Sequence, residues 1–123
     1  MSLANRRELL EMFVLDAIAD DYESLEKIKT EVISFGARAG MTVAADEATR
    51  ALVRLLEKGL AQAFRLESTQ TPQSHPGIPE ESLLGEYYFW TTDEGKQLQM
   101  GDYPAWPFND KGELRSDWQV PLD

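Results

Sequence analysis

The chain has 123 residues, no cysteine and a formal charge of −10. A chain of this length buries roughly two-thirds of the surface it would expose when unfolded, so a single domain with its own core is expected. The absence of cysteine excludes disulfides, thiolate metal sites and cysteine nucleophiles. It fits a reducing compartment, and the cytoplasm is the expected location.

The negative charge is concentrated in the second half of the chain. Residues 1–67 carry nine basic and twelve acidic side chains, whereas residues 68–123 carry three and ten. Nucleic-acid binders usually present a basic face to the phosphates, so this balance argues against a general affinity for DNA or RNA. No apolar run approaches membrane-spanning length, and no membrane partner is expected.

Three helices are predicted in the first half from apolar residues that recur at three- and four-residue spacing. Ser24 is placed to cap the second helix, and Gly40 is a natural stop for it. Gly59 ends the third helix because glycine can leave a helix through a positive φ angle. The predicted helices cover 6–20, 25–39 and 45–58.

Two strands and a fourth helix are predicted after the third helix. Residues 60–67 alternate imperfectly between apolar and polar, 68–82 have the composition of a loop, and 84–92 are rich in aromatic residues. We expect half of these aromatics in the core and half under the C-terminal tail. Thr92 is placed to cap a short helix over 93–100.

The tail is unusually aromatic for a solvated segment, so we expect it to pack on the rest of the protein. The predicted division is a domain over 1–100 and a C-terminal extension over 101–123. The aromatic residues in the extension are Tyr103, Trp106, Phe108 and Trp118.

Two segments resemble winged-helix transcriptional regulators of the PadR and MarR kinds. Residues 52–64, LVRLLEKGLAQAF, resemble the end of the recognition helix and the first wing strand. Residues 88–98, YFWTTDEGKQL, resemble the second wing strand and the following helix, with Thr92, Gly95 and Leu98 matching a Thr-x-x-Gly-x-x-Leu pattern. The resemblance implies an α+β winged helix-turn-helix with three helices, a two-stranded wing and a short following helix.

The same resemblance implies a DNA-binding regulator whose third helix enters the major groove. Arg50, Arg54 and Lys58 are then the candidate DNA contacts, because guanidinium and ammonium groups suit phosphates and guanine edges. Arg6 and Arg7 could add phosphate contacts. Two symmetric half-sites would favour a homodimer, formed through the first helix or the aromatic tail.

A second interpretation is a protein–protein interaction module without DNA binding. Glu47 and Glu57 lie three residues from Arg50 and Arg54 and can pair with them, which would make both arginines ordinary surface groups. The acidic composition favours this alternative, whereas the resemblance favours DNA. Winged helices serve both roles, so the fold alone does not choose between them.

The sequence predicts neither an enzyme nor a cofactor or metal site. His75 is the one histidine, stands in a Ser-His-Pro-Gly turn, and is expected to be a solvated loop residue. The adjacent acidic pairs Asp20–Asp21 and Glu80–Glu81 are expected to be solvated charges.

Overall fold

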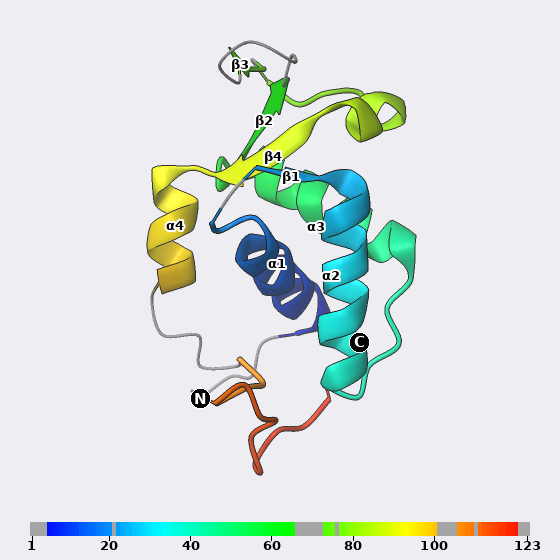
Figure 1. Ribbon diagram of the computed structural model, residues 1–123, viewed down its shortest axis with the longest axis vertical. Helices are drawn as coiled ribbons and strands as arrows, with labels where there is room; N and C mark the ends of the chain where they lie inside the picture. Colours follow the sequence, from blue (N-terminus) through cyan, green and yellow to red (C-terminus); the bar gives the residue numbers. More distant parts are fainter. Residues whose placement is uncertain are drawn as a thin grey trace.

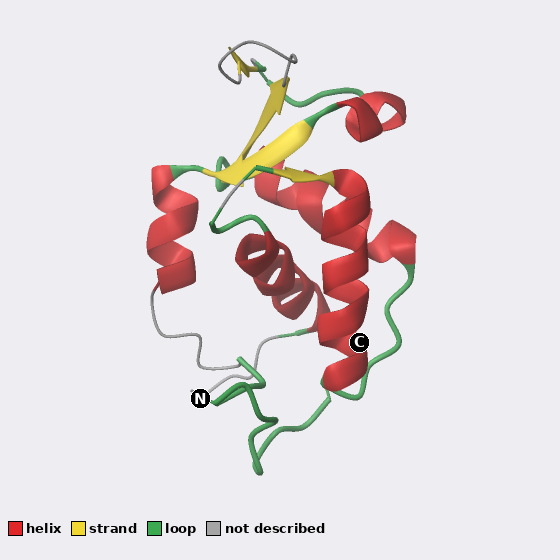
Figure 2. Cartoon of the chain, viewed as in Figure 1, coloured by secondary structure: helices red, strands yellow, loops and turns green. Residues whose placement is uncertain are grey.

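The computed structural model describes residues 5–20, 22–65, 73–75, 77–100, 106–109 and 111–120, with the backbone alone at 99 and 100. Over these residues the chain has a mixed α+β fold, in which a group of helices carries a small antiparallel sheet at one end (Figure 1). Figure 2 shows the sheet above the helices and the irregular C-terminal segment below them. None of the described helices is long and apolar enough to cross a membrane.

The three predicted helices are confirmed as α1 (Arg6–Ala17), α2 (Leu25–Arg38) and α3 (Ala45–Glu57). Helix α1 packs against both of the others, and its predicted apolar stripe lies in the hydrophobic core. It ends three residues earlier than predicted, although the chain stays buried as far as Ala19. The stripe consists of Leu9, Leu10, Phe13, Val14, Ala17 and Ile18.

Local signals at the helix ends act as the sequence suggests. The Ser24 hydroxyl accepts a hydrogen bond of 3.2 Å from the Lys27 amide at the start of α2. Gly59 has a φ angle of +73°, so the chain turns out of α3 through a conformation that residues with a Cβ rarely adopt.

The sheet has four strands in the order β1-β4-β2-β3, all antiparallel. Two of them, β2 (Ala61–Arg65) and β4 (Tyr88–Thr91), lie inside the predicted strands. The other two, β1 (Glu23–Ser24) and β3 (Gln73–Ser74), extend the sheet beyond the two strands that were predicted. Strands of two residues are too short for an alternating pattern to reveal them.

The prediction of one strand over 84–92 is wrong in its first part. A 3-10 helix, η1 (Glu81–Glu86), precedes β4. The Leu84 side chain is fully buried, and the Leu84 carbonyl accepts a hydrogen bond of 3.2 Å from the Tyr87 amide. A turn rather than a strand therefore carries this leucine into the core.

The aromatic residues of β4 divide between its two faces. Among the described residues, the C-terminal tail does not cover the outer face. Phe89 is fully buried on the inner face opposite Ala63. On the outer face Tyr22 packs on Trp90, with 4.6 Å between ring centroids, and on Phe64, with 4.9 Å. The α1–β1 connection thus takes the place expected for the tail.

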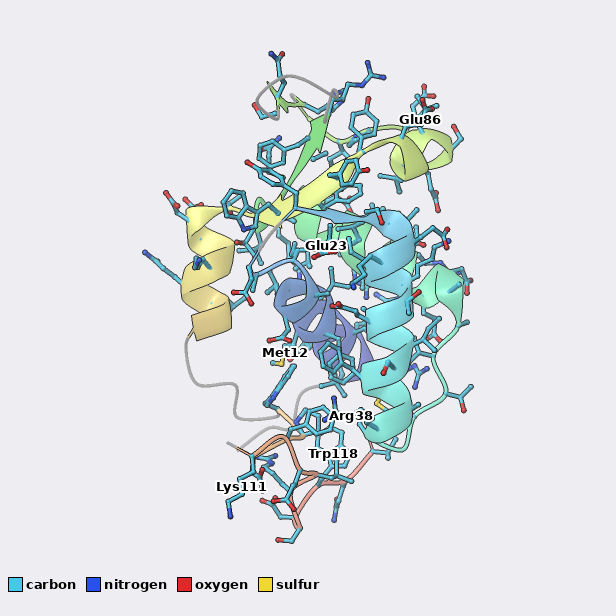
Figure 3. All side chains as sticks on the ribbon, viewed as in Figure 1. Met12, Glu23, Arg38, Glu86, Lys111 and Trp118 are labelled. Atoms are coloured by element: carbon cyan, nitrogen blue, oxygen red, sulfur yellow. The ribbon has the colours of Figure 1, made fainter. Side chains whose placement is uncertain are left out.

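The described aromatic residues of the C-terminal extension pack on α1 and α2 instead; Tyr103 lies outside the described residues. The Trp106 ring meets the Phe13 ring edge-on, with centroids 5.6 Å apart. The Trp118 indole donates a hydrogen bond of 2.9 Å to the Ala39 carbonyl, and Figure 3 shows Trp118 beside the end of α2. The extension therefore contributes to the core.

Thr92 joins α3, β2 and α4 (Asp93–Met100), the predicted fourth helix. Its hydroxyl donates to the Gly59 carbonyl over 2.7 Å and accepts from the Gly95 amide over 3.1 Å. A Cβ at Gly95 would lie 2.0 Å from the Leu60 carbonyl oxygen. The Thr-x-x-Gly pattern thus has a physical reason here: the threonine caps α4, and the glycine lets α4 approach the start of β2.

We expect Gly95→Ala to destabilise the protein by about 2 kcal/mol or more, because the added methyl group must displace backbone. Chemical denaturation measures this loss. Gly85→Ala is the matched control, since a Cβ there meets nothing within 4 Å. Equal stability of the two variants would contradict the described contact between α4 and β2.

Candidate functional site

The three predicted contact residues, Arg50, Arg54 and Lys58, lie along one side of α3 and are all engaged by carboxylates. Arg54 donates from Nε to an oxygen of Glu11 on α1 over 3.0 Å, and Lys58 pairs with the other oxygen of the same carboxylate. The Glu11 side chain is 9% exposed. Two of the three candidates therefore help to hold α1 and α3 together.

The expected partners of the two arginines differ from those in the structure. Arg50 pairs with Asp46, one turn earlier on α3, rather than with Glu47. Arg54 reaches Glu11, 43 residues away, rather than Glu57. Sequence spacing within one helix can suggest the first kind of partner but not the second, which depends on how two helices pack.

Glu47 instead forms a clamp between the N-terminal ends of α1 and α3. Arg6 donates to its two oxygens over 2.8 and 3.0 Å, and also to the Thr42 carbonyl over 2.6 Å. The Ala44 amide donates to Glu47 as well, over 3.0 Å. The Arg6 hydrogen bonds, followed by this amide, lower the pKa of Glu47 from its ordinary 4.5 to about 2.

A small pocket of about 170 Å³ opens between these two helices beside the clamp. It joins the first turn of α1 to the side of α3 that carries the predicted arginines. Four of its six lining residues are arginines, in a chain with twelve basic residues in all. The lining residues are Arg6, Arg7, Leu10, Glu47, Arg50 and Arg54.

A larger cleft of about 440 Å³ has the opposite charge and lies between the end of α1, β1 and α2. Its lining includes four carboxylates, and Figure 3 shows one of them, Glu23, at the junction of sheet and helices. Lys27 pairs with one of the four, its ammonium group lying 3.8 Å from Glu31. The full lining is Asp16, Ala17, Asp20, Glu23, Glu31, Ser34 and Phe35.

The surroundings of Glu31 in this acidic cleft disfavour its charged form. Burial, followed by the negative charge of Glu23, raises the pKa of Glu31 above its ordinary value, and Lys27 only partly opposes the shift. No local pattern in the sequence marks this cleft, because its residues come from three separate segments. Of the acidic pair at 20–21, Asp20 lines the cleft and Asp21 lies outside the described residues.

His75 is not the solvated residue that the sequence suggests. Its ring packs edge-on against Tyr87 with centroids 5.0 Å apart, and its carbonyl accepts a hydrogen bond of 2.6 Å from Gln62. The Glu80–Glu81 pair is exposed as expected. Within the described ranges, no group of three or more histidines and carboxylates is arranged to hold a metal ion.

Comparison with known proteins leaves the winged-helix resemblance as a prediction. No protein-family model, curated protein or solved structure matches this chain. The fold and the charged sites described above therefore carry the functional argument.

Removing the carboxylate that joins α1 to α3 should weaken the fold. We expect Glu11→Gln to lower the free energy of unfolding by about 2 kcal/mol, because Arg54 and Lys58 lose the charge that both contact. Asp46→Asn, which breaks an exposed pair on the same helix, should cost no more than about 0.5 kcal/mol. Urea denaturation of both variants distinguishes them, and equal losses would contradict a structural role for Glu11.

The Glu47 clamp should make stability depend on acid. A carboxylate whose pKa is lower in the folded state stabilises the protein fully above pH 4.5 and loses that contribution as the pH falls toward about 2. Glu47→Gln should remove about 1 to 2 kcal/mol of this pH-dependent stability, allowing for solvent screening at a side chain that is 29% exposed. Glu57→Gln, an exposed carboxylate on the same helix, is the control. Parallel stability curves for wild type and Glu47→Gln would refute the clamp.

Proposed function

We propose that the protein is a winged-helix interaction module that binds a basic segment of a partner protein in the acidic cleft. The element order supports the winged-helix part of the proposal: three helices precede β2 and β4, and α4 follows them. The contacts of Thr92 and Gly95 give structural roles to two residues of the motif on which the resemblance rests.

The observation that carries the proposal is the concentration of four carboxylates in one cleft. Asp16, Asp20, Glu23 and Glu31 come from three segments that the fold brings together. The raised pKa of Glu31 means that its charge is held at a cost in the free protein. Charges kept at such a cost are characteristic of binding sites, where a ligand of opposite sign stabilises the charged form.

The partner that fits this cleft is a peptide segment with arginine or lysine side chains. Its cations would balance the carboxylates of the cleft, to which Lys27 brings one positive charge. The net charge of −10 would also draw a basic partner toward the surface. The carboxylates line an open cleft and are not grouped to hold one metal ion. Extended basic side chains therefore suit the site better than a single cation does.

The DNA-binding regulator remains a second candidate, with one observation in its favour. Arg7 and Arg50 are exposed, and both line the arginine pocket between α1 and α3. The support is weaker because Arg54 and Lys58 already bind Glu11. The exposed charged residues of α3 also include Asp46 and Glu57, which would repel the phosphates of a duplex.

A homodimer would need a surface other than the two suggested by the sequence. Most of the apolar stripe of α1 is buried within the chain. The described aromatic residues of the extension pack against α1 and α2 of the same chain. Among their described residues, neither segment offers a large free apolar face, so we include no dimer in the proposal.

The proposal predicts that a short fluorescein-labelled arginine–serine peptide binds at low salt and that the acidic cleft is its site. The Glu23→Gln/Glu31→Gln variant should weaken binding about tenfold, as expected if each of two charge contacts contributes about 0.7 kcal/mol. Anisotropy titration measures the affinity. The variant should be at least as stable as the wild type, because the substitutions remove repulsion, so lost binding would not reflect unfolding.

The matched control is Glu80→Gln/Glu81→Gln, which makes the same change in net charge at two exposed positions outside the cleft. We expect it to change the affinity by less than about twofold. Equal weakening by both double variants would mean that the peptide senses the overall charge, and would reject the cleft as the site.

A further inference from the structure

We propose that the arginine pocket between α1 and α3 binds a single phosphate-type dianion, with Arg7 and Arg50 as its main ligands. This inference is independent of the basic partner proposed for the acidic cleft. The proposed ligand is an anion instead of a basic peptide, and the pocket shares no lining residue with the acidic cleft.

The size of the pocket suits a small anion. Its volume of about 170 Å³ corresponds to about five or six water molecules at roughly 30 Å³ each. A phosphate group with some of its hydration water fits such a space. Guanidinium groups are the side chains best matched to phosphate, because their N–H donors can form paired hydrogen bonds with two of its oxygens.

Two of the four guanidinium groups are held in place by carboxylates. Arg6 is fixed by Glu47, and Arg54 is fixed by Glu11. These pairs use only some of the five N–H donors of each guanidinium group. The carboxylates therefore position positive charge at the pocket without using all of its hydrogen-bonding capacity.

The other two guanidinium groups are available to a ligand. The Arg7 side chain is exposed and forms no hydrogen bond or ion pair with another described residue. Among the described residues, Arg50 forms an ion pair with Asp46, and their side chains are 62% and 63% exposed. Exposed pairs of this kind contribute little to stability, so a dianion that contacts both arginines can compete with Asp46.

The surroundings of the pocket favour one anion over a polyanion. The N-terminal end of α1 adds the positive end of a helix dipole at Arg6 and Arg7. Asp46 and Glu57, exposed on α3, place negative charge beside the pocket. A single phosphate group needs to displace only Asp46 from Arg50, whereas the neighbouring phosphates of a duplex must also pass near Glu57.

The test is a titration of the full chain with inorganic phosphate at constant ionic strength, followed by NMR of the arginine Nε–H groups. We expect saturable shifts with a dissociation constant on the order of millimolar, the range of a ligand bound by a few exposed charges. Arg7→Ala/Arg50→Ala should weaken binding about fivefold or more. It should keep the thermal midpoint of the wild type, because both side chains are exposed.

The charge-matched control is Lys96→Ala/Lys111→Ala, which removes two exposed cations that do not line the pocket. This variant should bind phosphate like the wild type. Shifts that do not saturate, or equal weakening in both double variants, would overturn the proposal. A parallel titration with duplex DNA tests the other source of phosphate. If the duplex binds more tightly than phosphate and its binding depends on Arg7 and Arg50, the pocket is part of a nucleic-acid-binding surface and not a single-anion site.

Discussion

The carboxylate of Glu11 stands between Arg54 and Lys58 at the contact of α1 and α3, and much of the molecule depends on that contact. Among the described residues, Glu11 is the one buried charged side chain. A buried carboxylate is costly unless its oxygens are paired, so the two cations are needed where they are. Two of the three residues that the winged-helix resemblance would assign to DNA, Arg54 and Lys58, are thereby part of the framework.

The position of α3 in turn determines where the sheet and α4 lie. Gly59 turns the chain from α3 into β2. Thr92, which directly follows β4, donates a hydrogen bond to the Gly59 carbonyl. Gly95 then lets α4 contact the start of β2. The same arrangement brings the end of α1, β1 and α2 around the acidic cleft, so the site is a product of the packing and not of any one segment.

How much could be predicted from the sequence follows from how local each feature is. The periodicity of α1, α2 and α3 and the signals at Ser24 and Gly59 act within a few residues, and all were found. The two-residue strands are too short to carry a pattern. The pairing of Arg54 with Glu11 and the acidic cleft depend on contacts between distant segments, which a single sequence does not display.

The central claim is that Arg54 and Lys58 hold α3 to α1 through Glu11. A double-mutant cycle on Glu11→Ala and Arg54→Ala tests it most directly. The coupling free energy from urea denaturation should be about 2 kcal/mol, because the Glu11 carboxylate that Arg54 contacts is largely removed from water. A coupling below about 0.5 kcal/mol, the range of an exposed surface pair, would contradict the account. Arg54 would then be free to serve a ligand, and DNA binding would regain its support.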